Sequence, residues 1–210
     1  MAIARFSADI KLCHRRRWPG KPFRLISGLW LLLSSRGLWL LLVHRISHWW
    51  VSRWTGPSRG SWQLRLIGIP LSSLEWLIKV STKSDILGRS DIEGGVCLPD
   101  EGCLIFGATK MGAGTVIGPR TTIGMSLADG GLPEIGRNVW IGADCVVYGS
   151  LTIGDGATLL PGTALTRSIP AGVVMQGNPA RVVVRDFDNT ALREQPDLDA
   201  NACVAAVRSN

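Results

Sequence analysis

Two carboxylates stand out because they lie where a regular pattern fails. Asp129 and Glu134 belong to the stretch MSLADGGLPE, residues 125–134. A carboxylate can act as a general base when it lies within hydrogen-bond reach of the proton and desolvation raises its pKa. Histidine titrates closer to neutrality, but the chain has only three histidines, all in its first 48 residues. Asp129 and Glu134 are therefore candidates for acid–base chemistry.

The pattern that fails at Asp129 is a six-residue repeat. Ten of the eleven positions reached by stepping six residues at a time from Ile105 to Leu165 are aliphatic or Met. An α-helix cannot hold this period, because at ~3.6 residues per turn the apolar positions drift around its axis. A hairpin strand alternates with period two. Self-similarity at six residues predicts a mainly β fold, a parallel β-helix in which each repeat forms one flat face of a coil.

The repeats are expected to fill residues 84–184, which gives roughly five coils at three hexapeptides each. Before Ile105 the pattern is one residue out of phase, and we place the inserted residue at that corner. Cys103 and Cys145 fall on small inward positions and are interpreted as core thiols. Asp129 would be buried and unpaired inside a coil, at a cost of several kcal/mol. The backbone should therefore leave the coil there, as a structural loop or as the wall of a site.

Residues 1–83 have a different character. They carry 14 Lys and Arg against two acidic residues, a balance of +12, whereas residues 84–210 balance to −5. Eight of the nine tryptophans also lie in this segment. We expect an N-terminal helical segment over 1–83 and a C-terminal tail over 185–210, read as a capping helix or disorder.

The apolar blocks of the N-terminal segment, Leu29–Leu33 and Leu38–Val43, are each far shorter than the ~20 residues that span a bilayer. Two interpretations stay open: a small helical bundle, or helices in the interface of an anionic membrane. A nucleic-acid partner is not expected, because the arginines interleave with Leu and Trp and form no polar basic face. Five scattered cysteines without a CxxC motif favour a reducing, cytoplasmic compartment.

Three features together resemble the left-handed β-helix acyltransferases, most of all the serine acetyltransferase group and related exopolysaccharide sugar O-acetyltransferases. They are the hexapeptides, the interruption before Leu132-Pro133-Glu134-Ile135-Gly136, and the ending Ser168-Ile169-Pro170 with Gly177-Asn178-Pro179-Ala180-Arg181. The resemblance implies a left-handed coil, acetyl-CoA as co-substrate, and a homotrimer with sites between neighbouring coils. It also implies cofactor-binding residues. Gly142 and Ala143 match a turn that holds the pantetheine, and Arg167 and Arg181 match basic residues that meet phosphate.

The resemblance breaks at the general base. Serine acetyltransferases use histidine, but the matching positions here are Gly107 and Leu132. Three alternatives remain: Asp129 or Glu134 is the base, an N-terminal histidine reaches a neighbouring subunit, or the protein binds acyl-CoA or a partner without catalysis. The γ-type carbonic anhydrases share the coil but hold zinc with three histidines, and residues 84–184 contain none, so no metal is expected.

The sequence thus predicts an acetyl-CoA-dependent O-acetyltransferase that acts on a hydroxyl of serine or of a saccharide. The basic, Trp-rich N-terminus favours a saccharide intermediate handled at the cytoplasmic, inner face of the membrane, with residues 1–83 associated peripherally. The alternative is a catalytically silent scaffold that docks to a membrane or to an enzyme partner.

Overall fold

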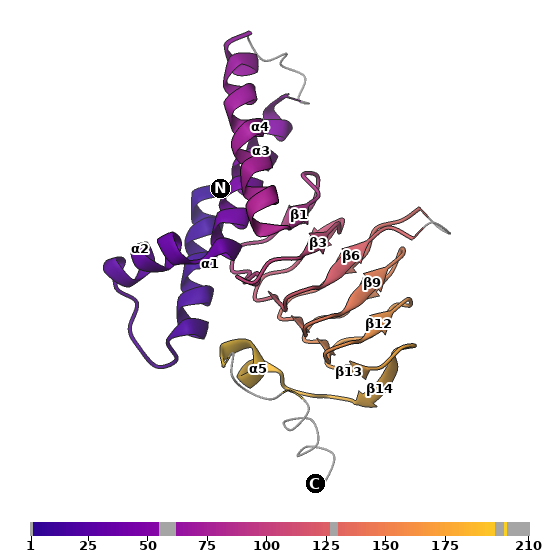
Figure 1. Ribbon diagram of the computed structural model, residues 1–210. Coiled ribbons are helices and arrows are strands. Elements are labelled where there is room, and N and C mark those ends of the chain that lie inside the picture. Colours follow the sequence, from indigo (N-terminus) through magenta and orange to yellow (C-terminus); the bar gives the residue numbers. More distant parts are fainter. Residues whose placement is uncertain (1, 55–61, 127–129, 196–199, 201–210) are drawn as a thin grey trace.

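A β-helix of five coils forms the body of the protein in this computed structural model, with the N-terminal helices gathered at its first coil (Figure 1). The structure describes residues 2–54, 62–126 and 130–195 together with Ala200, and their side chains except at positions 2 and 51–71. The helices are α1 (Ala2–Arg17), α2 (Leu25–Ser34), α3 (Arg36–Trp54), α4 (Trp62–Thr82) and α5 (Thr190–Glu194).

Three parallel sheets form the sides of the coil, which we call faces 1, 2 and 3. Face 1 contains β1 (Asp85–Ile86), β3 (Ile105–Phe106), β6 (Thr122–Gly124), β9 (Val146–Tyr148) and β12 (Ala164–Leu165). Face 2 contains β2 (Asp91–Ile92), β4 (Lys110–Met111), β7 (Glu134–Ile135) and β10 (Thr152–Ile153). Face 3 contains β5 (Val116–Ile117), β8 (Trp140–Ile141), β11 (Thr158–Leu159), β13 (Val174–Gln176) and the antiparallel β14 (Arg181–Val184).

The repeat residues fill the inside of the coil, as the six-residue period predicts. Met111, Ile141 and Leu159 are fully buried, and successive coils stack them in register, with Ile141 beside both Ile117 and Leu159. Burying one such side chain stabilises the fold by roughly 1.5–3 kcal/mol. The predicted parallel β-helix of about five coils is confirmed.

The predicted register is wrong at one corner. Phe106, not Ile105, is the inward residue of β3, and Ile105 is 56% exposed. The step from the preceding inward residue, Leu98, is therefore eight residues long, which a constant period of six cannot anticipate. Cys103 lies in this longer corner and is exposed, so its assignment as a core thiol is also wrong, whereas Cys145 is buried as predicted.

The N-terminal helices are fixed to the first coil by a buried ion pair. Arg45 of α3 donates from Nε and Nη2 to the carboxylate of Asp9 of α1, at 2.7 and 3.0 Å. The same carboxylate accepts the backbone N–H groups of Gly95 and Val96, at 2.7 and 2.9 Å. Arg45 also donates from Nη1 to the carbonyl of Ile92. Helices α1 and α3 are thereby joined to each other and to the coil.

The helices of the N-terminal segment are packed in one part and exposed in another, and the interpretation as a membrane interface stays a prediction. Leu38 and Leu41 of α3 are buried in the same core as the first coils, whereas most of α2 is exposed. Helix α4 runs without a break from Trp62 to Thr82. No single described helix is long and apolar enough to cross a membrane, although α2 and Arg36–Trp50 pass that test together as a pair bent by 90°.

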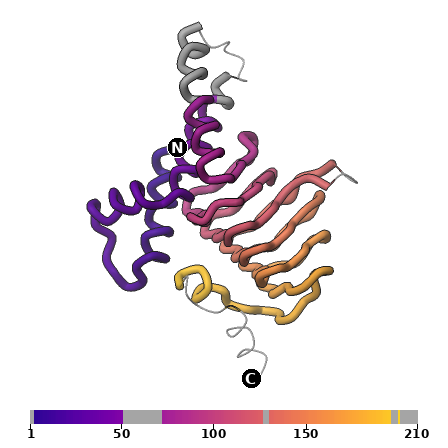
Figure 2. Tube along the Cα trace, in the orientation of Figure 1, coloured from indigo at the N-terminus to yellow at the C-terminus, as the bar shows by residue number. Residues whose placement is uncertain are grey.

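The C-terminal segment returns along the coil towards the helices (Figure 2). Phe187 and Leu192 are buried against Val116 and Trp140 on the outer surface of face 3. Its α5 reaches α1, where Arg16 donates from Nη1 to the carbonyl of Leu192 at 2.9 Å. The described part of the tail therefore covers a side of the coil.

Candidate active site

An excursion loop leaves the coil between β6 and β7. Successive inward residues are six apart on both sides of it, but Ile123 and Ile135 are twelve apart, so six extra residues leave the coil at this corner. Figure 1 shows the loop projecting beyond the other corners. The predicted excursion is confirmed. Asp129 itself lies outside the described residues, and its role stays a prediction.

The base of the loop is packed against neighbouring coils. The carbonyl of Pro133 accepts the N–H of Thr109, at 2.9 Å. A Cβ at Gly131 would collide with Ser150 of the next coil, so only glycine permits this close approach. The ends of the loop are thus held at the corner between faces 1 and 2, which we call the loop corner.

The two positions at which the resemblance implies histidines lie next to each other at the loop corner. A Cβ on Gly107 would stand 3.6 Å from Cδ2 of Leu132, an ordinary van der Waals contact. The two positions are therefore adjacent in space, but neither side chain can exchange a proton. Sequence comparison alone could identify the missing histidines but could not show that the two positions touch.

Glu134 lies on the outer surface of the coil. It is exposed at the start of β7 and lies between Lys110 and Thr152 of the neighbouring strands on face 2. The hollow that it lines, about 310 Å³ in volume, is also lined by Lys110, Arg137 and Asp155. This carboxylate is exposed to solvent and Asp129 lies outside the described residues, so the choice between the two candidate bases stays a prediction.

The N-terminal histidines are largely used within their own chain. His14 is buried, and its Nε2 lies 2.9 Å from Oγ of Ser27. His44 is buried between α3 and the first coil, where its Nε2 donates to the carbonyl of Ser90 at 3.2 Å. Burial, reinforced by the neighbouring His48, lowers the pKa of His44 to about 4. Two of the three histidines therefore cannot extend to a neighbouring subunit while these contacts persist.

The predicted pantetheine turn lies at a different corner, between faces 3 and 1, which we call the turn corner. Gly142 donates its N–H to the carbonyl of Leu159 at 2.8 Å, and its carbonyl accepts the hydroxyl of Thr121 at 3.1 Å. The carbonyl of Ala143 accepts the N–H of Gly162 at 2.9 Å. The amide of Gly142 is thus engaged within the coil. Its contribution is close packing, because a Cβ there would press on Pro161.

The two predicted phosphate-binding arginines come together on the last coil. Arg167 follows β12 and donates from Nη2 to the carbonyl of Ala180, at 3.3 Å. Arg181 directly follows Ala180 and is the first residue of β14, where it pairs with Gln176. Both are exposed, and neither forms a salt bridge with any residue that the structure describes. Two guanidinium groups without carboxylate partners suit a phosphate.

Sequence reasoning missed the outer surface of face 1, which lies between the loop corner and the turn corner. Ile105, Val146 and Tyr148 are 56%, 37% and 42% exposed there. These residues occupy outward positions of the strands, where the six-residue rule sets no requirement. Large apolar side chains at outward positions were the available signal.

Comparison with known proteins agrees with this architecture. The family described as bacterial transferase hexapeptide (six repeats) matches residues 133–167. A serine acetyltransferase from Synechococcus elongatus is 27% identical over 191 residues, which cover 83% of this chain and 69% of that protein. A galactoside O-acetyltransferase from Escherichia coli is 45% identical over 49 residues, 23% of this chain and 24% of its own length.

The fold also matches solved structures. The crystal structure of a serine acetyltransferase from Vibrio cholerae superimposes with a TM-score of 0.75 at 21% identity, covering 95% of this chain and 72% of that one. Together with the matched repeats and the five stacked coils, this agreement shows that the chain has the left-handed β-helix fold built from hexapeptide repeats.

Proposed function

We propose that this protein is an acetyl-CoA-dependent O-acetyltransferase, serine acetyltransferase-like, whose acceptor is a hydroxyl of serine or of a saccharide. The observation that carries the proposal is the similarity to a serine acetyltransferase over most of the chain. A shorter match to a galactoside O-acetyltransferase supports a saccharide as the alternative acceptor.

The reaction assigns a distinct task to each group. Asp129 takes the proton from the acceptor hydroxyl as its oxygen attacks the thioester carbonyl; the C–O bond forms, the C–S bond breaks, and the departing thiolate takes up a proton. Arg167 and Arg181 bind phosphate groups of the co-substrate, and the turn at Ala143 lies along its pantetheine.

A homotrimer is part of this proposal. A face six residues wide is about 20 Å across, whereas a general base must lie within ~3 Å of its proton. A site that uses both the loop corner and the turn corner therefore needs the two corners from different subunits. The exposed apolar side chains Ile105, Val146 and Tyr148 support packing of face 1 against another copy. Light scattering should give a mass three times the chain's 22.7 kDa.

The acceptor favoured by the N-terminal segment is a saccharide intermediate of polysaccharide biosynthesis at the cytoplasmic face of the membrane. The support is the balance of +12 over residues 1–83, which carry eight of the nine tryptophans. Soluble serine would need no such segment.

The test is release of coenzyme A from acetyl-CoA, measured with serine and with a panel of saccharide acceptors. Asp129→Asn keeps the size of the side chain but removes the base, and we expect a loss of about 10²–10⁴-fold in turnover. Glu134→Gln is the matched control and should change turnover little, because Glu134 is exposed on face 2. Binding of coenzyme A without turnover on any hydroxyl acceptor would refute the proposed reaction.

One observation favours a second candidate, a catalytically silent scaffold. Gly107 and Leu132 occupy the two positions at which the resemblance implies histidine, and neither side chain can titrate. A scaffold predicts that Asp129→Ala and Glu134→Ala leave cellular function intact. Loss of function in Asp129→Ala, with the oligomer preserved, would reject the scaffold.

A further inference from the structure

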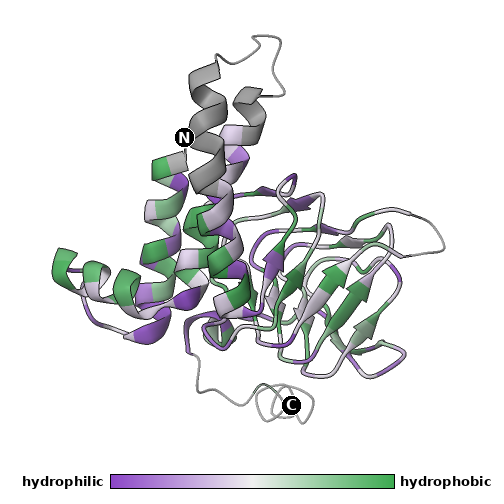
Figure 3. Cartoon of the chain, turned by 45° about the horizontal axis from the view of Figure 1, so that its top comes forward, coloured by the Kyte–Doolittle hydropathy of each residue, from purple (hydrophilic) through white to green (hydrophobic). Residues whose placement is uncertain are grey.

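Helix α2 leaves its apolar side chains in solvent. Its sequence is LISGLWLLLS, yet only Gly28 and Leu31 are buried, both where the helix faces the rest of the protein. Leu25 is 85% exposed, Ile26 82% and Leu33 68%. Figure 3 shows this hydrophobic helix extending away from the coil. An apolar helix surface that is exposed to solvent indicates a binding surface.

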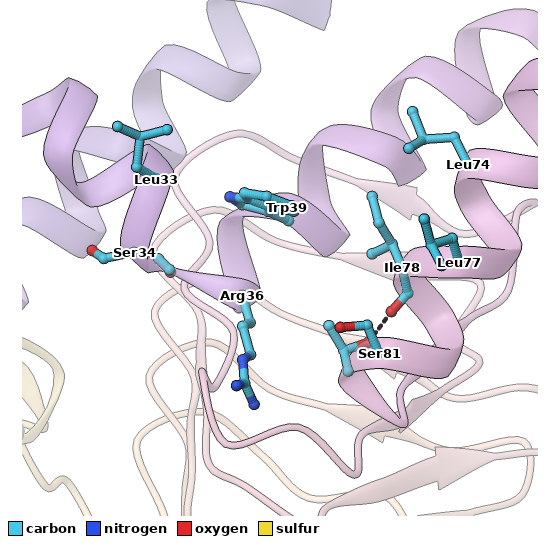
Figure 4. A pocket seen from close by; sticks show the side chains of 10 residues that line it. Leu33, Ser34, Arg36, Trp39, Leu74, Leu77, Ile78 and Ser81 are labelled. Carbon is cyan, nitrogen blue, oxygen red and sulfur yellow. Dashed lines mark hydrogen bonds between the residues drawn. The ribbon is translucent and has the colours of Figure 1, made fainter.

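The apolar surface continues from α2 across α3 to α4. A groove of about 450 Å³ lies between these helices, and Figure 4 shows Leu33, Trp39 and Leu77 around it. Leu74 of α4 lines the same groove and is 46% exposed. The surface is therefore one continuous apolar region, which we call the α2–α4 surface.

The rim of the α2–α4 surface is basic. Residues 10–74 contain no Asp or Glu at all. Lys21 and Arg24 precede α2, Arg36 follows it, and all three are exposed without a salt bridge to any described residue. Trp30 and Trp39 are 51% and 44% exposed. Apolar side chains with Trp and unpaired cations match the acyl chains and anionic headgroups of a bilayer surface.

The geometry selects a helix that lies in the membrane interface. Ten residues of α-helix are about 15 Å long, half of the ~30 Å hydrocarbon thickness, so α2 cannot cross it. The bend of 90° sets α3 at a right angle to α2, so the two helices do not form one continuous span. A second copy of this surface is a poorer occupant, because an isologous contact would place the basic rims against each other.

We propose that the α2–α4 surface docks the protein onto an anionic lipid bilayer, with α2 at the boundary between headgroups and acyl chains. This deepens the membrane-face location proposed above and rests on that location, but not on the acetyl transfer. Because α1 and α3 are bound to the first coil through Asp9 and Arg45, docking also fixes how the coil stands on the membrane.

Flotation of the full-length protein with vesicles tests the proposal. We compare phosphatidylcholine vesicles with vesicles that also contain phosphatidylglycerol. The wild type should float with the anionic vesicles, and less so as salt is raised. Leu25→Glu combined with Leu29→Glu places two carboxylates on one side of α2 and should lower the bound fraction about tenfold or more. Lys21→Glu with Arg24→Glu should abolish the preference for anionic lipid.

The control is Val182→Glu, which adds a single carboxylate at an exposed apolar residue of β14, on the last coil. It should float like the wild type. Circular dichroism and the oligomer mass must match the wild type for each variant, so that lost folding is not scored as lost docking.

Failure of the wild type to float, or equal loss in Val182→Glu, would overturn the proposal. So would a Leu25→Glu/Leu29→Glu variant that floats normally but forms smaller oligomers, since a second copy would then be the occupant. Coenzyme A release with a soluble acceptor is measured separately, so failure of docking is distinguishable from failure of the reaction.

Discussion

The coil and the N-terminal helices are both rich in large apolar residues, but the coil buries them and α2 exposes them. In the coil, Met111, Ile141 and Leu159 point inward and are fully buried. In α2, Leu25 and Ile26 are more than four-fifths exposed. The six-residue period lets the coil bury its apolar side chains inside itself. A ten-residue apolar helix that packs along one edge leaves the others exposed. The difference supports the proposal that the coil carries the chemistry and that the helices determine where the protein is located.

The junction between these regions offers the largest expected effect. Arg45→Met leaves the buried carboxylate of Asp9 without its cation, and breaking such a pair costs about 3–5 kcal/mol of unfolding free energy. Urea unfolding followed by circular dichroism measures this. The double variant Asp9→Leu/Arg45→Met removes both charges and should recover much of the loss. A single variant as stable as the wild type would mean that the helices are not fixed to the coil as described.

The same substitution in the two regions tests the contrast itself. Leu159→Ala removes a fully buried side chain from the coil and should cost about 2–5 kcal/mol. Leu25→Ala on α2 should stay within about 0.5 kcal/mol when no lipid is present. Both are measured by urea unfolding. Comparable losses at the two positions would show that α2 is buried in the assembled protein, which contradicts the contrast.

His44 makes the junction sensitive to pH. Its folded pKa is about 4, below the ~6.5 of the unfolded chain, so the unfolded state binds more protons between these values. Stability is complete above pH ~6.5 and falls, by an amount on the order of 3 kcal/mol, as pH drops to about 4. Unfolding midpoints across this window measure the effect. His44→Gln keeps a donor for the carbonyl of Ser90 and should flatten the profile; parallel profiles would refute the assignment.

The smallest effect is expected from an ion pair on the surface of the coil. Arg137 donates from Nε to Glu93 at 3.0 Å, and its side chain is 62% exposed. Exposed pairs contribute little, because solvent and salt screen them. Arg137→Gln should shift the unfolding midpoint much less than Arg45→Met or Leu159→Ala, and the shift should shrink at high salt. A shift as large as that of Arg45→Met would erase the distinction between the buried junction and the hydrated coil surface.

The sequence predicts the coil well because its period is a physical requirement of stacking. Every third hexapeptide must place an aliphatic above the one before, as Ile117, Ile141 and Leu159 do. The prediction failed at Ile105 and Cys103, where one corner is longer and no rule sets its length. The excursion at Asp129 was predictable, because a carboxylate cannot replace an inward aliphatic.

Less of the site and of the helices could be predicted. The sequence does not show that the amide of Gly142 donates to the carbonyl of Leu159, or that Gly107 lies beside Leu132. Both facts depend on how neighbouring coils stack. Hydropathy is misleading here, because α2 is the more apolar of the two helices and yet most of it is exposed. Only packing decides that Leu38 and Leu41 are covered while Leu25 and Leu33 are not.

The division between chemistry and location is tested most directly by coenzyme A release from the Leu25→Glu/Leu29→Glu variant. The acceptor is a soluble one on which the wild type turns over, and no vesicles are present. The account predicts turnover equal to the wild type, although the variant no longer floats with anionic vesicles. Loss of turnover together with loss of flotation, in a folded protein of unchanged oligomer mass, would contradict it.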